Sequence, residues 1–462
     1  MILTNPEHKI FFMNGTDKAK SIEDLKQFLR FPSISTDSSK KSSVADCAKW
    51  LCIYLKKIGL QRVVLHPTKL HPIVYAEQIA HPSFKTILFY GHYDVQPVAP
   101  VSKWKYPPFE PVIINNHIYG RGASDDKGQL FIHVKAIEYI FKSQIPLKVN
   151  IKCLYEGEEE IGSPNLPAFI LDFKKMLACD AAVVSDTKML SADIPAITYS
   201  LRGSLNAEII IRGQSKDLHS GTFGGMVLNP VDILCRMVSG LTDAYGKISI
   251  PGFYSDVLPV SQNERWYMKK SAPSDAVLLK DAGVKNSWGE PGFTNYERTT
   301  IRPSAVVTTL VAGYTGEGSK NAIPSEASMK LNIRLAPRQN PGKIASLLNS
   351  YFKTKIPDGF KFKIRYSSPT SPVEVSRTNI YVQAAANAYT KAFTRQPVFL
   401  RSGGTIPVVS MLTNELNVTV VMMGFALISD NMHAPDEKFY LPNFFRGIET
   451  IAEFIQNISN LK

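Results

Sequence analysis

The sequence predicts an α/β fold: a mostly parallel sheet flanked by helices, with a separate α+β segment inserted into it. Three observations support this prediction. Apolar runs that end in polar residues alternate with helical periodicity up to Tyr199. Beyond that residue, strand-like stretches of alternating polarity dominate until the helical character resumes at Tyr381. The length of 462 residues also exceeds the usual size of one hydrophobic core.

The first segment contains three predicted helices and several predicted buried strands. Apolar residues recur at helical spacing between Ser21 and Leu60, and Gly59 ends the second helix. The run TILFYGHYD (Thr86 to Asp94) stays apolar until its end, as a buried strand does. NIKCLYEGEEEIGS and AAVVSDT repeat this pattern, and DDKGQLFIHVKAIEYIF is typical of a helix with an acidic start. Sites in such sheets form at the carboxyl ends of strands, where the following residues lie: His92, Asp94, Glu159, Glu160 and Asp186.

The segment after Tyr199 has a different pattern. SLNAEIIIRG, VVTTLVAGY, ASMKLNIRLAP and FKFKIRYSS are typical of strands, whereas PVDILCRMVSGL and PGKIASLLNSYFKTK are typical of helices. YVQAAANAYTKAF, LRSGGTIPVVSML and VTVVMMG return to the first pattern. We therefore expect one domain made of residues 1–199 and 376–462, and an inserted domain made of residues 200–375.

The formal net charge is +13, from 53 Lys and Arg against 40 Asp and Glu. A nucleic-acid-binding protein is one explanation of such a charge. The basic residues are scattered, however, and the densest acidic run, Glu156 to Glu160, lies at a predicted strand end. An acidic cluster at a candidate site would repel the phosphates of a nucleic acid. We interpret the charge as a basic enzyme surface and expect no nucleic-acid partner.

The cysteines and the apolar stretches bear on the cellular compartment of the protein. The five cysteines are odd in number and include no C-x-x-C, which indicates free thiols in a reducing environment. The first twenty residues lack the apolar core of a signal peptide. The longest apolar stretches, such as Val418 to Ile428, are too short to span a bilayer. We expect a cytoplasmic protein with no membrane partner.

Three of the nine histidines stand in dense polar clusters: His92, His219 and His433. We expect His133 to be structural because it lies within a predicted helix, and we expect surface positions for His66, His71 and His81. His92 and Asp94 close an apolar strand as residues i and i+2, so their side chains share one face. A carboxylate in that position can orient a metal-binding imidazole, although a structural pair would have the same pattern.

Carboxylates cluster at three further points. Asp125 and Asp126 lie in the glycine-flanked turn GRGASDDKG before a helix, where helix capping explains one of them well and two less well. YEGEEEIGS places four glutamates within five positions after a strand. Such crowding is costly unless cations compensate it, but a solvated acidic loop is an equal alternative. Spacing alone cannot choose among its glutamates: Glu156, Glu158, Glu159 and Glu160.

These clusters together bring two histidines and several carboxylates to the ends of neighbouring strands. Mixed imidazole and carboxylate ligands suit zinc, manganese or cobalt, and the absence of cysteine ligands disfavours a structural zinc site. A carboxylate that bridges two ions roughly 3.5–4 Å apart is the usual design of a two-metal hydrolase. The sequence therefore predicts a two-metal centre.

Eight motifs occur in a fixed order between His92 and Glu437: H-x-D, G-R-G-x-x-D-D-K-G, E-G-x-E-E-x-G-S, S-D-T, D-L-H-S-G, K-N-x-I-P, G-G-T-I-P and N-x-H-A-P-x-E. This ordered set resembles the co-catalytic zinc aminoacylase/carboxypeptidase family of metallopeptidases. DLHSGTFGGMVLNP and ERTTIRPS make it most similar to the branch of cytosolic nonspecific dipeptidases and carnosinases. The resemblance implies a zinc-peptidase-like sheet with an inserted α+β lid and dimerisation domain.

The resemblance also implies roles for individual residues at the metal centre. His92 and Asp186 would bind one metal, Glu160 and His433 the other, and Asp125 would bridge the two, with a cis peptide before Asp126. Asp94 would orient His92. Glu159 would be the general base, taking a proton from a water between the metals and passing it to the leaving nitrogen. The cofactor is expected to be two divalent ions, zinc first, with manganese or cobalt as alternatives.

Further residues are assigned to the substrate by the same resemblance. His219 would assist oxyanion stabilisation in the site of a neighbouring subunit, which implies a homodimer formed through the lid domain. The substrate's free carboxylate would be held by Asn321, Arg334, Gly404 and Thr405. The sequence departs from the dipeptidase branch at Ser402 and Thr405, where Glu and Ser are common. The hydroxyl is kept but the acid is lost, which bears on how the amino end of a substrate is recognised.

The functional hypothesis is a metal-dependent dipeptidase that acts on small peptides. The alternative with the same chemistry is an N-acyl-amino-acid deacylase, or aminoacylase, and the pocket from Ser402 to Thr405 is the feature that separates them. Alternatives from other classes are a nucleic-acid-binding protein and a metal-free scaffold on this fold. The presence of every expected ligand type disfavours the scaffold.

Overall fold

The computed structural model describes residues 13–143 and 146–461. The chain divides into two compact units. The first contains residues 1–199, 375–400 and 407–462, and the second contains residues 200–374 and 401–406. The short stretch 401–406 thus groups with the second unit, whereas the sequence analysis assigned it to the C-terminal part of the first domain. Each unit has its own apolar core.

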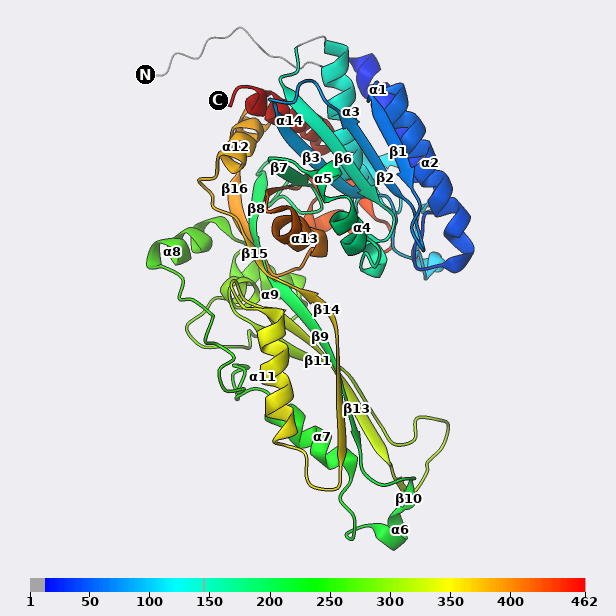
Figure 1. Ribbon diagram of the computed structural model, residues 1–462, viewed down its shortest axis with the longest axis vertical. Helices are drawn as coiled ribbons and strands as arrows, with labels where there is room; N and C mark the ends of the chain where they lie inside the picture. Colours follow the sequence, from blue (N-terminus) through cyan, green and yellow to red (C-terminus); the bar gives the residue numbers. More distant parts are fainter. Residues whose placement is uncertain (1–12, 144–145, 462) are drawn as a thin grey trace. The chain divides into compact units, whose positions relative to one another are not determined.

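A large sheet is built mostly from residues of the first unit (Figure 1). Its strand order is β1-β2-β6-β3-β7-β17-β8-β15, and β16 pairs with β8. The strands have the following bounds: β1 Arg62–His66, β2 Ile73–Gln78, β3 Lys85–His92, β6 Val149–Glu156, β7 Ala181–Val184, β8 Ala196–Leu201, β15 Val373–Glu374, β16 Val398–Ser402 and β17 Thr419–Met423.

The four neighbouring strands β6, β3, β7 and β17 pair in parallel. The pairs β1-β2, β2-β6, β17-β8 and β15-β8 are antiparallel. The α/β fold is confirmed, and the sheet is mixed where the sequence predicted a mostly parallel one. Periodicity within a strand does not reveal which strands pair with it or in which direction, so the antiparallel pairs were not predicted.

Helices cover this sheet (Figure 1). Ile87 and Phe89 of β3 pack in one core with helical residues, and the alternate residues Leu88 and Tyr90 are also buried, so β3 is covered on both faces. The helices have the following bounds: α1 Gly15–Leu29, α2 Lys41–Lys57, α3 Lys127–Ser143, α4 Leu166–Asp172, α5 Lys174–Leu177, α12 Ile380–Phe393, α13 Pro407–Leu416 and α14 Leu441–Ser459. A small antiparallel sheet adds β4 Val112–Ile114, β5 His117–Tyr119 and β18 Lys438–Tyr440.

The second unit contains a four-stranded antiparallel sheet in the order β11-β13-β9-β14. Its strands are β9 Gly203–Arg212, β11 Ser304–Ala312, β13 Glu326–Leu335 and β14 Lys361–Thr370. Burial alternates along β9 and β13 because one face packs against α7 Pro230–Ser239 and α11 Pro341–Lys353. Shorter elements complete the unit: β10 Leu218–His219, α6 Ser220–Phe223, α8 Gln262–Ser271, α9 Asp275–Asp281, α10 Asn295–Thr300 and β12 Ala322–Ile323.

All five cysteines are free, and three of them are buried: Cys47, Cys52 and Cys153. Within residues 13–143 and 146–461, none of the helices has both the length and the apolar character needed to cross a bilayer.

Candidate metal centre

The candidate site lies where three adjacent parallel strands end. His92 is the last residue of β3 and pairs with Glu156, the last residue of β6. On the other side, Tyr90 of β3 pairs with Val184, the last residue of β7, so Asp186 extends two residues beyond that strand. Because neighbouring parallel strands end at the same sheet edge, the residues that follow them meet there.

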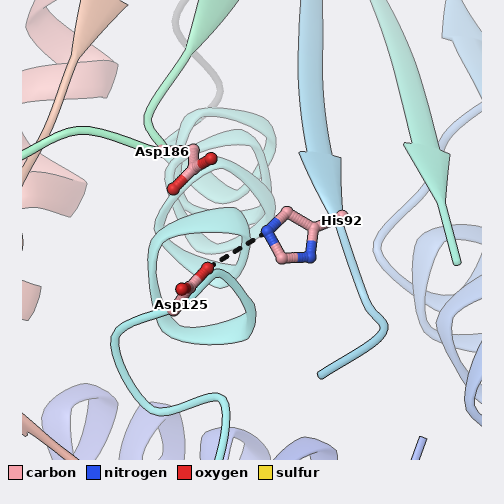
Figure 2. Close-up of side chains that lie close together, drawn as sticks. All are labelled: His92, Asp125 and Asp186. Atoms are coloured by element: carbon pink, nitrogen blue, oxygen red, sulfur yellow. Dashed lines mark ion pairs between the residues drawn. The ribbon is translucent and has the colours of Figure 1, made fainter. Parts of the chain in front are cut away.

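Two groups of potential ligand atoms form at this edge, each with all atoms within 4.8 Å of one another. The first contains His92, Asp125 and Asp186, whose side chains turn toward one another in Figure 2. The second contains Asp125, Glu160 and His433. Asp125 belongs to both groups. The peptide bond between Asp125 and Asp126 is cis, as the sequence analysis expected.

The two histidines approach different oxygens of Asp125. Nε2 of His92 lies 3.2 Å from Oδ1, and Nε2 of His433 lies 2.7 Å from Oδ2. Nε2 of His433 is also 3.5 Å from Oε1 of Glu160. Asp125 therefore stands between the two groups with one carboxylate oxygen facing each of them.

The site concentrates buried carboxylates that cannot all keep their ordinary acidity. Burial and the charges of Asp125 and Asp126 raise the pKa of Asp186 well above its usual range. Burial and the charge of Asp125 raise the pKa of Glu160 to about 8, and burial also raises the pKa of Glu159. Burial would raise the pKa of Asp125 too, but its contacts with His433 and His92 lower it. A bound cation would remove this conflict between burial and charge.

His92 shows the complementary effect. Burial disfavours its imidazolium form, but the neighbouring carboxylates of Asp125 and Asp94 raise the pKa of His92 well above its usual value. Its other ring nitrogen, Nδ1, lies 3.2 Å from the carbonyl oxygen of Asp94 and 3.4 Å from Oδ1 of the same residue. Asp94 therefore fixes the ring orientation, which leaves Nε2 facing Asp125 and Asp186.

Asp94 also holds the turn that follows β6. Its two carboxylate oxygens accept hydrogen bonds from the backbone amides of Glu159 at 3.2 Å and Glu160 at 3.0 Å. These two glutamates form the short 3-10 helix η3 (Glu159–Ile161), which ends at Gly162 with a φ of +85°. One aspartate thus orients residues of two neighbouring strand ends.

The four glutamates of the acidic cluster separate into two pairs. Glu156 accepts hydrogen bonds from the hydroxyls of Tyr90 and Ser163, and burial raises its pKa to about 8. Glu158 accepts them from the Thr68 hydroxyl, the His71 amide and Asn165. The hydrogen-bonding capacity of both carboxylates is thus used by neighbouring residues of the protein rather than directed at the ligand groups. Glu159 and Glu160 are the pair on the ligand side, which sequence spacing alone could not distinguish.

The surroundings of other histidines differ in part from expectation. The surface prediction for His71 is wrong: this residue is 5% exposed, and Nε2 lies 3.2 Å from the carbonyl oxygen of Ser35. The flanking proline and polar residues of its stretch concealed its partner Glu158, which lies 87 positions further on. His133 is buried in α3 beside Ser185, as expected of a structural residue.

Sequence reasoning missed Gln96. Its side-chain amide donates a 2.6 Å hydrogen bond to Oε2 of Glu160. Gln96 is four residues beyond His92 in HYDVQP, and this proximity to a candidate ligand is the only signal of it in the sequence.

The residues assigned to the substrate by resemblance all belong to the second unit. Nη1 of Arg334 donates to the Thr405 hydroxyl at 2.9 Å, and this hydroxyl donates to the carbonyl oxygen of Arg202 at 2.7 Å. The Gly404 amide donates a hydrogen bond to the Ser402 hydroxyl. The segment with Arg334 and the segment 401–406 are therefore joined directly.

His219 and Asn321 lie together elsewhere in the same unit. β10 pairs with β12, and His219 is the register partner of Ala322. The Ser220 amide donates to the carbonyl oxygen of Asn321 at 3.1 Å. The His219 side chain is exposed, and its Nδ1 accepts a hydrogen bond from the Gly221 amide. The structure thus brings these two residues to one surface of the second unit.

The chain is similar to known proteins over most of its length. Residues 88–457 match the model of peptidase family M20/M25/M40. The chain is 32% identical over 461 residues to the Cys-Gly metallodipeptidase of Candida albicans, covering 95% of this chain and 94% of that protein. It is 28% identical over 401 residues to the human Beta-Ala-His dipeptidase, covering 84% of this chain and 78% of that protein.

Solved structures give the same result. The M20 family metallo-carboxypeptidase of Sulfolobus solfataricus superposes with a TM-score of 0.87 at 33% identity, covering 97% of this chain and all of that one. The Saccharomyces cerevisiae dipeptidase Dug1p superposes with a TM-score of 0.82 at 29% identity, covering 96% and 97%. The family match extends over most of the chain and includes all the strand ends that carry the site. The chain therefore belongs to peptidase family M20/M25/M40 and is a peptidase.

Proposed function

We propose that the protein is a metal-dependent dipeptidase. The observation that carries the proposal is the position of Asp125, which belongs to both ligand groups and presents a different oxygen to each histidine. This arrangement suits a carboxylate that bridges two ions. The substrate class rests on the relatives, which include a Cys-Gly metallodipeptidase and a Beta-Ala-His dipeptidase.

The residues of the centre fit a pair of divalent ions. Nε2 of His92 and Oε1 of Glu160 are buried atoms without a hydrogen-bond partner among the described residues, as the ligand atoms of an ion would be. His92, Asp186 and Asp125 would hold one ion, and Asp125, Glu160 and His433 the other. Imidazole and carboxylate ligands suit zinc, with manganese and cobalt as alternatives. When bound, the ions supply Lewis acidity and lower the pKa of water.

Glu159 is the proposed general base. It stands beside Glu160, its backbone amide donates to Asp94, and burial raises the pKa of its carboxyl above the ordinary value. Glu159 takes a proton from the attacking water and delivers it to the nitrogen of the scissile bond, which then leaves as an amine. Asp94 contributes by holding both His92 and the Glu159 turn.

Arg334, Thr405, Gly404 and Asn321 are proposed to bind the free carboxylate of the substrate. Arg334 has one hydrogen bond to a side chain and no acidic partner among the described residues, so its planar fork is available for a carboxylate. His219 is proposed to assist oxyanion stabilisation in the site of a second subunit. Its exposed position supports this role.

A homodimer formed through the second unit completes the proposal. β11 is an edge strand of the four-stranded sheet and exposes Val306, Leu310 and Val311. Exposed apolar edge strands pair readily with another chain. Light scattering is expected to give the mass of a dimer, and Leu310→Lys is expected to shift it to that of a monomer. The five free thiols favour the cytoplasm as the location.

Two other substrate classes are tested beside dipeptides. The similarity to a metallo-carboxypeptidase favours a second candidate function, removal of the last residue from longer peptides. Deacylation of N-acyl amino acids is the third possibility with this chemistry. The deciding experiment removes metal with a chelator, restores Zn²⁺, Mn²⁺ or Co²⁺, and compares kcat/KM on dipeptides, longer peptides and N-acetyl amino acids. We expect kcat/KM to be highest on dipeptides. Cleavage of acylated amino acids alone would contradict the proposed function.

A further inference from the structure

Glu437 is the last residue of the N-x-H-A-P-x-E motif, and its carboxylate is completely buried. Oε1 accepts hydrogen bonds from the backbone amides of Ser124 at 2.9 Å and Asp125 at 3.0 Å. Oε2 accepts them from the Gly122 amide at 2.9 Å and from Nη1 of Arg121 at 2.8 Å. Both oxygens are therefore occupied by the loop that carries Asp125.

The same residue belongs to the loop that carries His433, four positions earlier. His433 has a φ of +62°, a left-handed conformation that a residue with a side chain adopts only when its surroundings impose it. The backbone carbonyl of Glu437 accepts the Gly120 amide at 2.9 Å, and β18 continues this pairing with β5. Main chain and side chain of Glu437 thus attach the His433 loop to the Asp125 loop.

Arg121 of the G-R-G motif extends the connection to a third loop. It is 2% exposed, and besides Glu437 it donates from Nη2 to the carbonyl oxygen of Pro97 at 3.1 Å. Its guanidinium lies over the Trp104 ring, 5.0 Å from the centroid. Pro97 directly follows Gln96, the residue that donates to Glu160. The loops that carry or support Asp125, His433 and Glu160 therefore meet at one buried ion pair.

We propose that Glu437 and Arg121 are positioning residues of the metal centre. Neither reaches the ligand atoms; instead they hold the main chain at Asp125 and the loop of His433 at a fixed separation before an ion binds. The proposal rests on the proposed metal centre and adds these two residues to it. Outer residues that orient ligands typically contribute about 10- to 100-fold to metal affinity.

Glu437→Gln is the most direct test. The amide has the size of the carboxylate but turns one oxygen into an NH₂ donor, which would face backbone N–H donors. Zn²⁺ affinity is measured by competition with a chromophoric chelator, together with the melting temperature of the metal-free protein. We expect Zn²⁺ affinity to fall by about 10- to 100-fold while circular dichroism stays that of the wild type.

Glu138→Gln is the matched control. Glu138 is also a buried carboxylate in an ion pair, with Lys135, but it lies in α3 away from the ligand groups. We expect this variant to lower the melting temperature and leave Zn²⁺ affinity unchanged. A loss of stability without a loss of affinity in Glu437→Gln, as in the control, overturns the proposal.

Arg121→Met is the second test, for the case that Glu437→Gln does not fold. This substitution removes the guanidinium donor to Glu437 and leaves the three backbone amides that donate to the same carboxylate. We expect a several-fold loss of Zn²⁺ affinity, and an unchanged affinity contradicts the proposal. The Zn²⁺ affinity of the wild type distinguishes a failure of the proposed function from a failure of the positioning role. If the wild type binds no divalent ion, the proposed function fails; if it binds normally and both variants match it, only the role of Glu437 and Arg121 fails.

Discussion

The side chain of Gln96 donates a 2.6 Å hydrogen bond to Oε2 of Glu160, and this leaves Oε1 on the side of His433. A neutral amide in this place fixes one oxygen of the carboxylate without adding charge. Glu160 is thereby oriented so that only one of its oxygens faces the second ligand group.

Gln96→Leu is expected to weaken metal binding at that group. Without the donor, the Glu160 side chain can rotate, so its ligand oxygen is no longer fixed before an ion binds. The metal concentration needed for half-maximal activity should rise by about 10-fold, with kcat largely restored by excess Zn²⁺. An activity loss that excess metal does not reverse would show that Gln96 acts on the substrate instead.

Asp125 and Asp186 are expected to differ in their effect on metal stoichiometry. Asp125 belongs to both ligand groups and Asp186 only to the first. Asp125→Asn should therefore weaken the binding of both ions. Asp186→Asn should cause the loss of one ion and leave the other bound. The metal-to-protein ratio after dialysis, measured by mass spectrometry, distinguishes these outcomes. Equal loss in both variants would contradict a bridging Asp125.

Glu159→Gln is expected to lower kcat by about 10²- to 10⁴-fold with near-normal metal content, because the amide cannot accept a proton. Glu158→Gln is the comparison in the same cluster. Its carboxylate accepts hydrogen bonds from Thr68, His71 and Asn165. This change should therefore lower the melting temperature and leave kcat close to that of the wild type. Retained turnover in Glu159→Gln would mean that another residue is the base.

Arg334→Met is expected to raise KM for dipeptides with a free carboxylate. The loss of a hydrogen bond to a charged group, about 1.5–3 kcal/mol, corresponds to roughly 10- to 150-fold. Dipeptide amides, which lack the charge, should be affected much less. Arg365→Met serves as control because Arg365 pairs with Glu208 on the same sheet and is exposed. An equal effect on dipeptides and their amides would exclude the carboxylate role.

His133 is expected to link stability to pH. Burial lowers the pKa of His133 from 6.5 to about 3. The unfolded chain takes up a proton below pH 6.5, but the folded chain does not until about pH 3. Stability is therefore fully present above pH 6.5 and falls as the pH is lowered toward 3, by about 2 kcal/mol at pH 5.

His133→Gln should remove this part of the pH dependence. Urea unfolding of metal-free protein at pH 7 and pH 5 gives the free energy of unfolding at each pH. The difference between the two should be smaller in the variant than in the wild type. His81→Gln, at an exposed position, should keep the wild-type difference. Identical differences in wild type and His133→Gln would contradict the assignment.

The secondary structure of the chain was largely predictable because its signals are local. The run from Thr86 to Asp94 reads as a buried strand, and β3 ends at His92. The predicted helix at Tyr381 is α12. Apolar periodicity depends only on which face of an element is buried. The order of the strands has no such local signal, and the antiparallel pairing at the sides of the sheet was missed for that reason.

The site was predictable to the extent that its residues follow strands. His92 ends β3, Asp186 lies two residues beyond β7 and Glu160 lies four residues beyond β6, so their meeting at one sheet edge follows from parallel pairing. Gln96 gave no comparable signal, and Glu437 was marked only as the last residue of a motif. Each acts on a residue at a strand end or in a distant loop, and a hydrogen bond across 64 or 313 positions leaves no trace in local patterning.

By itself, the sequence determined the residue types of the centre, the strand ends that carry them and, through the order of its motifs, the resemblance to a metallopeptidase family. The resemblance selected Glu159 and Glu160, and only the tertiary structure showed which partners hold the other two glutamates inward. Glu156 and Glu158 are directed inward by Tyr90, Ser163, Thr68 and Asn165. The four carboxylates are chemically alike within five positions, so their roles depend on which partners folding places beside each one, because a buried carboxylate needs donors or a cation.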